Sequence, residues 1–153
     1  TVWSDIVSKN GNLLLSVPLR ADGTFDEKEE KILNEFGAWM NINKEAIYDT
    51  RPWVVFGEGP IAEEDIPPIA QGFNEGSYSQ AGAKEIRFTQ TPKYLYATVL
   101  AWPADGKVNI KSLAADNKLY EGKIRKVELL GYGKSRFLSV LPKACRLRFL
   151  RSR

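Results

Sequence analysis

Residues 10–40 read NGNLLLSVPLRADGTFDEKEEKILNEFGAWM, and this stretch decides the fold class of the first part of the chain. Residues 13–17 form a largely apolar run that ends at a proline, a pattern typical of a parallel strand covered on both faces. The RADGT sequence that follows predicts a turn. Apolar residues then recur at helical spacing between Ile32 and Met40, so we expect a helix over residues 26–43.

Signals for helix ends flank the predicted strand. The chain begins with apolar residues at helical spacing and then has an Asn-Gly pair suited to a left-handed helix end. We therefore expect residues 1–9 to be the last turns of a helix that starts upstream. Thr24 stands three residues before Glu27, which predicts a capping box. Residues 1–43 thus predict a helix–strand–helix unit of parallel α/β type.

The pattern changes at residues 51–52, beyond which short strand-like runs alternate with turns. Residues 57–84 are rich in Gly, Pro, Glu and Ser and predict a long loop, and the Asp-Gly pair in PADGK predicts a hairpin turn. The strand spacing favours an antiparallel β-sandwich of about 100 residues that buries Trp53, Val99 and Leu129. The strand candidates are residues 53–56, 86–89, 94–101, 108–110, 124–130, 137–141 and 147–150.

Composition excludes several kinds of site. Of the 153 residues 43% are apolar, and the chain has one cysteine and no histidine. An internal disulfide, zinc sites of the HExxH type and histidine-dependent catalytic triads are therefore excluded. We expect neither a metal nor a cofactor. No apolar run approaches the ~18 residues that a membrane-spanning helix needs.

Charge is distributed unevenly along the chain. The formal net charge is +3, but the last twenty residues, from Lys134 to Arg153, contain seven basic residues and no acidic one. The remainder carries 15 basic against 19 acidic residues. Because the basic tail contains no groove-reading motif, we expect no nucleic-acid partner.

The acidic residues suggest no catalytic pair. Glu63, Glu64 and Asp65 are the densest group outside the predicted helix, but they stand in the loop-like segment, where solvated carboxylates are the usual case. The acids at positions 26, 27, 29 and 30 suit the start of a helix, whose dipole favours anions. Cys145 has no histidine to activate it. We assign no catalytic residue to this chain.

Four aromatic residues in the β region are candidates for stacking against sugar rings. Tyr94 and Tyr96 share one face of a predicted strand, Trp102 follows that strand, and Trp53 begins another. Aromatic residues also favour strands and bury large areas, so packing within the sheets is the competing interpretation.

A longer stretch carries a family resemblance. Residues 5–60 read DIVSKNGNLLLSVPLRADGTFDEKEEKILNEFGAWMNINKEAIYDTRPWVVFGEGP. The segments NGNLLL, ADGT, GAWM, EAIY and TRPW within it closely resemble the α-L-fucosidases of glycoside hydrolase family 29. A looser similarity continues through IRFT, LYATVLAWPADGKVNIKSL and VELLGYG to residue 133. Residues 134–153 do not resemble the family's last strands, and an out-of-frame reading is one hypothesis for them.

The resemblance implies a (β/α)8-like catalytic barrel followed by a β-sandwich, with residues 13–17 as the last barrel strand and residues 26–43 as the last barrel helix. It also implies hydrolysis of terminal α-L-fucose from glycans with retention, by an Asp nucleophile and a Glu or other acid. Those residues lie on earlier barrel strands, upstream of this chain. The Pro18–Gly23 loop would lie at the end of the barrel that carries active sites, without a role for any one residue.

The chain departs from the family pattern at four positions in the quoted stretch. Ser16 stands where Asn is usual, Leu19 where Pro often follows, and Lys44 and Asp49 where Gly is common. Lys44 matters most, because the Gly at that position is expected to be left-handed. That conformation would cost a Lys on the order of 1 kcal/mol.

Together these features predict an α/β segment followed by an all-β domain. Residues 1–51 are expected to be the C-terminal end of the barrel and residues 52–153 an antiparallel β-sandwich. The parent protein would be a periplasmic or secreted fucosidase acting on fucosylated glycans, with the remaining barrel as this segment's partner. The chain alone would be inactive and poorly stable or self-associating. The alternatives are a stand-alone carbohydrate-binding sandwich and a structural module.

Overall fold

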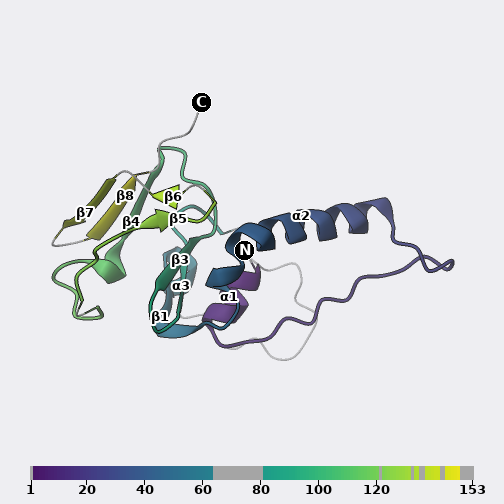
Figure 1. The fold of residues 1–153 in the computed structure, drawn as a ribbon, viewed down its shortest axis with the longest axis horizontal. Helices are drawn as coiled ribbons and strands as arrows, with labels where there is room; N and C mark the ends of the chain where they lie inside the picture. The colour runs from purple at the N-terminus through teal and green to yellow at the C-terminus, as the bar shows by residue number, and fades with distance from the viewer. Residues whose placement is uncertain are drawn as a thin grey trace.

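The computed structural model describes residues 2–63, 81–120, 122–131, 133–134, 137–141 and 144–148. Helices α1 and α2 precede all of the strands (Figure 1). Helix α1 lies against the first sheet, whereas α2 and the extended segment before it project from the strands as a long arm. The predicted β-rich region in the later part of the chain is confirmed.

Helix α1 spans Val2–Ser8 and ends at the predicted Asn-Gly pair. Asn10 has a left-handed φ of 62°, and its N–H donates to the carbonyl of Val7 at 3.0 Å. The N–H of Gly11 donates to the carbonyl of Ile6 at 2.9 Å. These two hydrogen bonds form a Schellman motif, which satisfies carbonyl groups that the end of a helix leaves free.

The strand predicted over residues 13–17 is absent from the described structure. No described strand pairs with residues 11–18, and Leu14 is 96% exposed. A buried parallel strand needs hydrogen-bonded neighbours for its N–H and C=O groups. The described part of this chain supplies no such neighbours, so the apolar run remains without strand pairing.

Helix α2 spans Glu27–Asn43, close to the predicted range, but its cap differs from the prediction. Asp26 is the N-cap, and its side chain accepts a hydrogen bond from the N–H of Lys28 at 3.0 Å. Thr24 lies in the preceding turn, where its hydroxyl donates to Asp22 Oδ1 at 2.7 Å. The capping role predicted for Thr24 therefore belongs to Asp26, whose carboxylate stands directly before the free N–H groups of the first turn.

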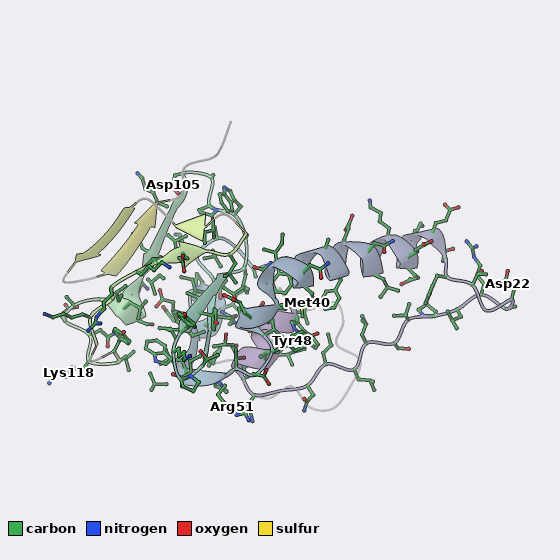
Figure 2. All side chains as sticks on the ribbon, in the orientation of Figure 1. Asp22, Met40, Tyr48, Arg51, Asp105 and Lys118 are labelled. Atoms are coloured by element: carbon green, nitrogen blue, oxygen red, sulfur yellow. The ribbon has the colours of Figure 1, made fainter. Side chains whose placement is uncertain are left out.

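The RADGT turn forms the tip of the arm, where Figure 2 labels Asp22. Leu19 and Phe25 form an isolated antiparallel bridge across it, and Gly23 has a φ of 82°. The N–H of Arg20 donates to the carbonyl of Thr24 at 2.8 Å, which closes the turn as predicted.

A short 3-10 helix, η1, spans Lys44–Ala46 and connects α2 to the first sheet. Lys44 has φ −53° and ψ −32°, which is ordinary right-handed geometry, so the strain predicted at Lys44 is wrong. Lys44 continues the helical turn because its N–H donates to the carbonyl of Met40. The left-handed conformation occurs later, at Asp49, with a φ of 57°.

Three antiparallel strands form the first sheet, in the order β1–β2–β3. Leu95, Ala97 and Val99 of the third strand pack against the core, so they alternate with Tyr94 and Tyr96, which the sequence predicts to share the other face. A short helix follows the first strand. The bounds are Arg51–Glu58 for β1, Pro60–Glu63 for α3, Ile86–Gln90 for β2 and Leu95–Val99 for β3.

The second sheet has the order β4–β8–β7, and β5 and β6 form a separate pair. The strand predicted over residues 124–130 is reduced to two residues, and the last strand begins earlier than predicted. The bounds are Lys107–Ile110 for β4, Lys111–Leu113 for the 3-10 helix η2, Glu128–Leu129 for β5, Gly133–Lys134 for β6, Phe137–Leu141 for β7 and Ala144–Arg148 for β8.

The Asp-Gly turn forms, but it does not connect two paired strands. Gly106 has a φ of 65°, and its N–H donates to the carbonyl of Pro103 at 3.0 Å. The turn leads from β3 to β4, which pair with β2 and β8 respectively and lie in different sheets. The dipeptide predicted the local turn correctly, whereas strand pairing depends on partners far away in the sequence.

The core lies between the two sheets. Ile86 and Phe88 of β2 form a cluster with Val108 and Ile110 of β4, and each is 2% exposed or less. Trp53 packs edge-on against Phe88 with ring centroids 5.1 Å apart. All three residues predicted for the core are half-buried: Trp53 and Val99 pack against the cluster, whereas Leu129 lies on β5 outside it. Two sheets that share one apolar core make a β-sandwich.

Candidate functional site: a buried ion cluster and a tyrosine pocket

Arg87 is the centre of a buried group of charges where α1 meets the first sheet. Its side chain is 4% exposed. Its Nε donates to Asp5 Oδ1 of α1, and its Nη1 donates to Glu85 Oε2 at 3.0 Å. The guanidinium also lies over the Phe56 ring, 5.7 Å from its centroid. A buried carboxylate such as Glu85, which is 2% exposed, requires this pairing.

A second buried carboxylate joins β1 to η2. Glu58 accepts hydrogen bonds from the N–H of Lys111 at 2.8 Å and from the N–H of Ser112 at 2.7 Å, and also from the Ser112 hydroxyl. The other oxygen of Glu85 accepts from the N–H of Ile61 at 2.7 Å. Both buried carboxylates are fully engaged with structural donors, so neither is available as a general acid or base.

Asp5 is the partly exposed member of the Arg87 group. Burial tends to raise the pKa of its carboxyl, but hydrogen bonds from Lys9 and Arg87 outweigh that effect and hold the pKa below its ordinary value. The Lys9 Nζ lies 2.8 Å from Asp5 Oδ2 and 4.9 Å from the centroid of the Phe56 ring. The carboxylate is therefore stabilised in its charged form at neutral pH.

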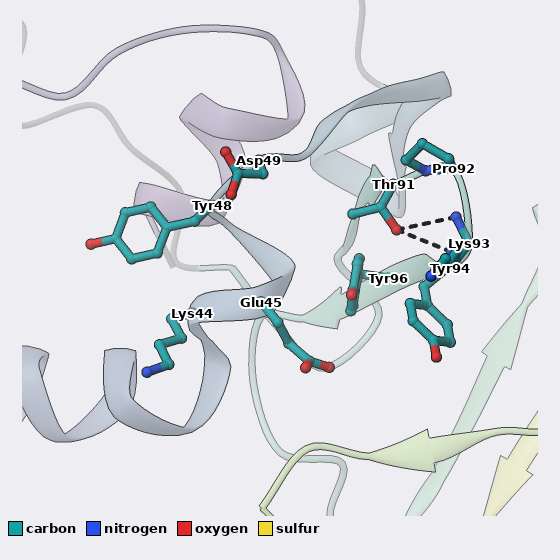
Figure 3. A pocket seen from close by; sticks show the side chains of 9 residues that line it. All are labelled: Lys44, Glu45, Tyr48, Asp49, Thr91, Pro92, Lys93, Tyr94 and Tyr96. Carbon is teal, nitrogen blue, oxygen red and sulfur yellow. Dashed lines mark hydrogen bonds between the residues drawn. The ribbon is translucent and has the colours of Figure 1, made fainter.

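An open pocket of about 520 Å³ lies between η1 and the turn that joins β2 to β3 (Figure 3). Its lining residues come from these two chain segments, which are far apart in sequence. Its lining consists of Lys44, Glu45, Tyr48, Asp49, Thr91, Pro92, Lys93, Tyr94 and Tyr96.

Two tyrosines give the pocket its aromatic wall. The rings of Tyr94 and Tyr96 are 6.3 Å apart at an angle of 57°. Tyr94 is 62% exposed, whereas Tyr96 is half-buried. Burial raises the pKa of the Tyr96 hydroxyl, and the nearby Glu45 carboxylate raises it further, so this phenol stays protonated.

The structure separates the four aromatic candidates predicted from the sequence. Tyr94 and Tyr96 lie together in the pocket. Trp102 is 55% exposed but does not line the pocket, and Trp53 packs in the core. Packing is therefore the correct interpretation for Trp53, and only the tyrosine pair contributes to a shared concave surface.

The other predicted candidates lie apart from the pocket. Glu63 forms an exposed ion pair with Lys111 at 3.2 Å, while Glu64 and Asp65 lie outside the described residues. Asp26 caps α2, and Cys145 lies on β8 opposite Ile110 of β4. The Pro18–Gly23 loop is the exposed tip of the arm, remote from the pocket in the fold (Figure 2).

The described residues contain no group of three or more Cys, Asp and Glu side chains that could hold a metal ion. Within the same ranges, no helix is both long enough and apolar enough to cross a membrane.

Sequence analysis missed most of the charged residues of the pocket. In the sequence Lys44 and Asp49 stand out only as departures from the family pattern, and nothing marks Glu45, Tyr48 or Lys93 as site residues. These residues come from two segments that meet only in the folded chain. The signal that could have led to this region was the pair of non-glycine residues on either side of EAIY.

Comparison with known proteins assigns the chain to a family. The sequence model described as Alpha-L-fucosidase matches residues 3–45, and the one described as Alpha-L-fucosidase C-terminal domain matches residues 80–146. The second match extends past residue 133, so the family likeness includes part of the basic tail. Because the first match precedes the β region, a stand-alone β-sandwich module is not favoured.

Individual relatives agree with these matches. The tissue α-L-fucosidase of Rattus norvegicus is 30% identical over 106 residues, which are 69% of this chain and 18% of that protein. The plasma α-L-fucosidase of Homo sapiens is 28% identical over 131 residues, 84% of this chain and 22% of that protein. The chain thus spans about a fifth of the length of these curated relatives.

A solved structure shows the same fold. The Thermotoga maritima α-fucosidase in complex with fucose superposes with a TM-score of 0.64 and 25% identity, over 97% of this chain and 29% of that one. The described helices and antiparallel sheets therefore have the architecture of the C-terminal part of the solved α-fucosidases. The chain belongs to the α-L-fucosidases of glycoside hydrolase family 29.

Proposed function

We propose that this chain is the C-terminal portion of a retaining α-L-fucosidase that hydrolyses terminal α-L-fucose from glycans, and that it is inactive by itself. The two curated relatives are named as α-L-fucosidases, and the related solved structure is that of an α-fucosidase in complex with fucose. The two buried carboxylates of the described residues, Glu58 and Glu85, are engaged in structural hydrogen bonds. The preceding part of the polypeptide would therefore supply the nucleophile and the acid.

The observation that carries the proposal is the apolar surface of the arm. Leu14 is 96% exposed and Leu15 is 53% exposed within a run that has the composition of a buried strand. Ile32 on α2 is also exposed. Adjacent exposed apolar side chains of this size normally have a partner surface. The much greater length of the relatives supports the preceding barrel of the same polypeptide as that partner.

A domain boundary near residue 51 belongs to the same proposal. Residues 1–51 would be the end of a (β/α)8-like barrel, with residues 13–17 becoming its last strand once neighbouring strands pair with them. Residues 52–153 would form the β-sandwich. The start of β1 at Arg51, two residues after the left-handed Asp49, supports a boundary at this position.

The sandwich would have a structural role in the complete enzyme. The ion cluster around Arg87 supports this role, because it fixes α1, which precedes the predicted barrel strand, to the first sheet. The enzyme would act in the periplasm or outside the cell on fucosylated glycans, and the plasma relative supports an exported location.

The test is expression of the complete polypeptide after sequencing of the coding DNA on both sides of this segment. We expect an in-frame barrel upstream, fucose release from 4-nitrophenyl α-L-fucopyranoside, and α-fucose as the first product detected by NMR. The purified 153-residue chain is the control and should release no fucose above background. An inactive complete polypeptide, or an active isolated chain, would contradict the proposal.

A further inference from the structure

We propose that the tyrosine pocket between η1 and the β2–β3 turn is a carbohydrate-binding site that holds one uncharged sugar ring. The inference that the sugar is uncharged rests on the residues that line the pocket. The choice of a fucosylated glycan as the natural source of that sugar rests on the proposed function.

The aromatic wall provides a stacking surface. Tyr94 exposes 62% of its surface, and the Tyr96 ring lies beside it at a centroid distance of 6.3 Å. A pyranose ring has an apolar face of C–H groups, which packs against the negative face of an aromatic ring. Tyrosine suits such a site because its hydroxyl can also reach solvent or a sugar hydroxyl.

The turn that carries Tyr94 is held in place before any ligand binds. The Thr91 hydroxyl oxygen accepts hydrogen bonds from the N–H of Lys93 at 3.4 Å and from the N–H of Tyr94 at 3.1 Å, as Figure 3 shows. The N–H of Thr91 donates to the carbonyl of Tyr94 at 2.9 Å. A preformed turn lowers the entropy lost on binding.

The charged side chains around the pocket balance each other. Lys44 and Lys93 are opposed by Glu45 and Asp49, so the lining has no net formal charge. Within the described ranges these four side chains form no hydrogen bond or ion pair with one another or with other residues. They therefore present separate donors and acceptors, which match a ligand rich in hydroxyl groups rather than an anion or a cation.

The backbone at Asp49 is a further sign of a site. Its φ of 57° is left-handed, a conformation that Asp adopts more readily than most residues but less readily than glycine. Strained positions of this kind concentrate at binding sites, where a side chain is needed at a position that stability alone would give to glycine. Asp49 keeps this left-handed backbone and places its carboxylate in the lining of the pocket.

The experiment measures saccharide binding to the 153-residue chain by saturation-transfer NMR and by calorimetric titration. The neutral probes are 2′-fucosyllactose and lactose, and the charged probes are sialyllactose and a glucosamine oligomer. We expect millimolar binding of the neutral probes and weaker binding of both charged probes. No binding of either neutral probe, or tighter binding of a charged probe, would overturn the proposal.

Three variants locate the binding. Tyr94→Ala should lower affinity at least tenfold, whereas Tyr94→Phe should retain most of it because the ring remains. Tyr120→Ala, at an exposed tyrosine outside the pocket, is the matched control and should bind as the parent chain does. Unchanged affinity of Tyr94→Ala would place the sugar elsewhere and refute the assignment.

The substitution Asp49→Gly tests the role of Asp49 in binding separately from its effect on the stability of the fold. Glycine relieves the left-handed strain, so this variant should unfold at the same temperature or higher while its affinity for 2′-fucosyllactose falls severalfold. Unchanged affinity would remove Asp49 from the site. Because the chain is expected to lack catalytic residues, these binding results are independent of fucose release by the complete polypeptide, which tests the proposed function separately.

Discussion

Asp5 and Arg87 are 82 residues apart in sequence and form an ion pair that joins helix α1 to strand β2. The same guanidinium holds the buried Glu85 at 3.0 Å. One cation is therefore shared by two carboxylates from different parts of the chain, and Lys9 is the second cation beside Asp5. The N-terminal helix and the first sheet are therefore joined by a charged contact.

The substitution Arg87→Ala should destabilise the chain strongly. It leaves Glu85 buried without a cation, and breaking a buried pair in this way costs about 3–5 kcal/mol. Urea unfolding would measure the loss. Lys31→Ala removes one partner of the exposed Lys31–Glu35 pair and is the matched control, with an expected change below about 1 kcal/mol. Equal losses of unfolding free energy from the two substitutions would show that the buried ion pairs of Arg87 stabilise the chain no more than an exposed pair does.

The Asp5 carboxyl should make stability dependent on acidic pH. Its folded-state pKa is lowered, so its contribution is fully present above the unfolded value of about 3.9 and is lost as pH falls through the folded value. Thermal unfolding of the parent chain and of Asp5→Asn between neutral pH and pH 2 would test this. The difference between the two should shrink on acidification, and a constant difference would contradict the prediction.

Glycine should be required at position 59, where β1 has just ended. Gly59 has a φ of 125°, and an added Cβ would lie 2.6 Å from the carbonyl oxygen of Lys84. Gly59→Ala should therefore lower the unfolding free energy by at least about 1–3 kcal/mol. Gly82→Ala is the control, because a Cβ there meets nothing within 4 Å, and its effect should stay within about 0.5 kcal/mol. A neutral Gly59→Ala variant would refute this account of the motif GEGP.

The exposed leucines of the arm should promote self-association of the isolated chain. Replacing Leu14 and Leu15 by Ser should reduce association in sedimentation experiments without lowering the unfolding temperature. In the complete polypeptide the same change should cost about 1.5–3 kcal/mol for each leucine, because burial there would be lost. Val54→Ser, at a 65% exposed position of β1, is the control and should change neither the association of the isolated chain nor the stability of the complete polypeptide. Association that persists in the leucine variant would point to another surface.

The local features of the fold were predictable because short-range interactions produce them. The Schellman end of α1, the turn at the tip of the arm and most of α2 depend on residues within a few positions of one another. The cap of α2 was assigned to Thr24 instead of Asp26, because both residue types favour that role and only geometry separates them. The left-handed conformation predicted at Lys44 is wrong for a similar reason, since the left-handed residue lies five positions later.

The amino-acid sequence by itself determined the family, the order of helical and β regions and the alternation of β3, because these follow from motifs and from periodicity. Only the tertiary structure decided that the Asp-Gly turn connects two sheets, that Arg87 joins Asp5 to Glu85, and that two distant segments form the tyrosine pocket. Pairing across long sequence separations depends on the whole packed chain. The unpaired run at residues 13–17 shows the same dependence, because an apolar sequence becomes a strand only where neighbours accept its hydrogen bonds.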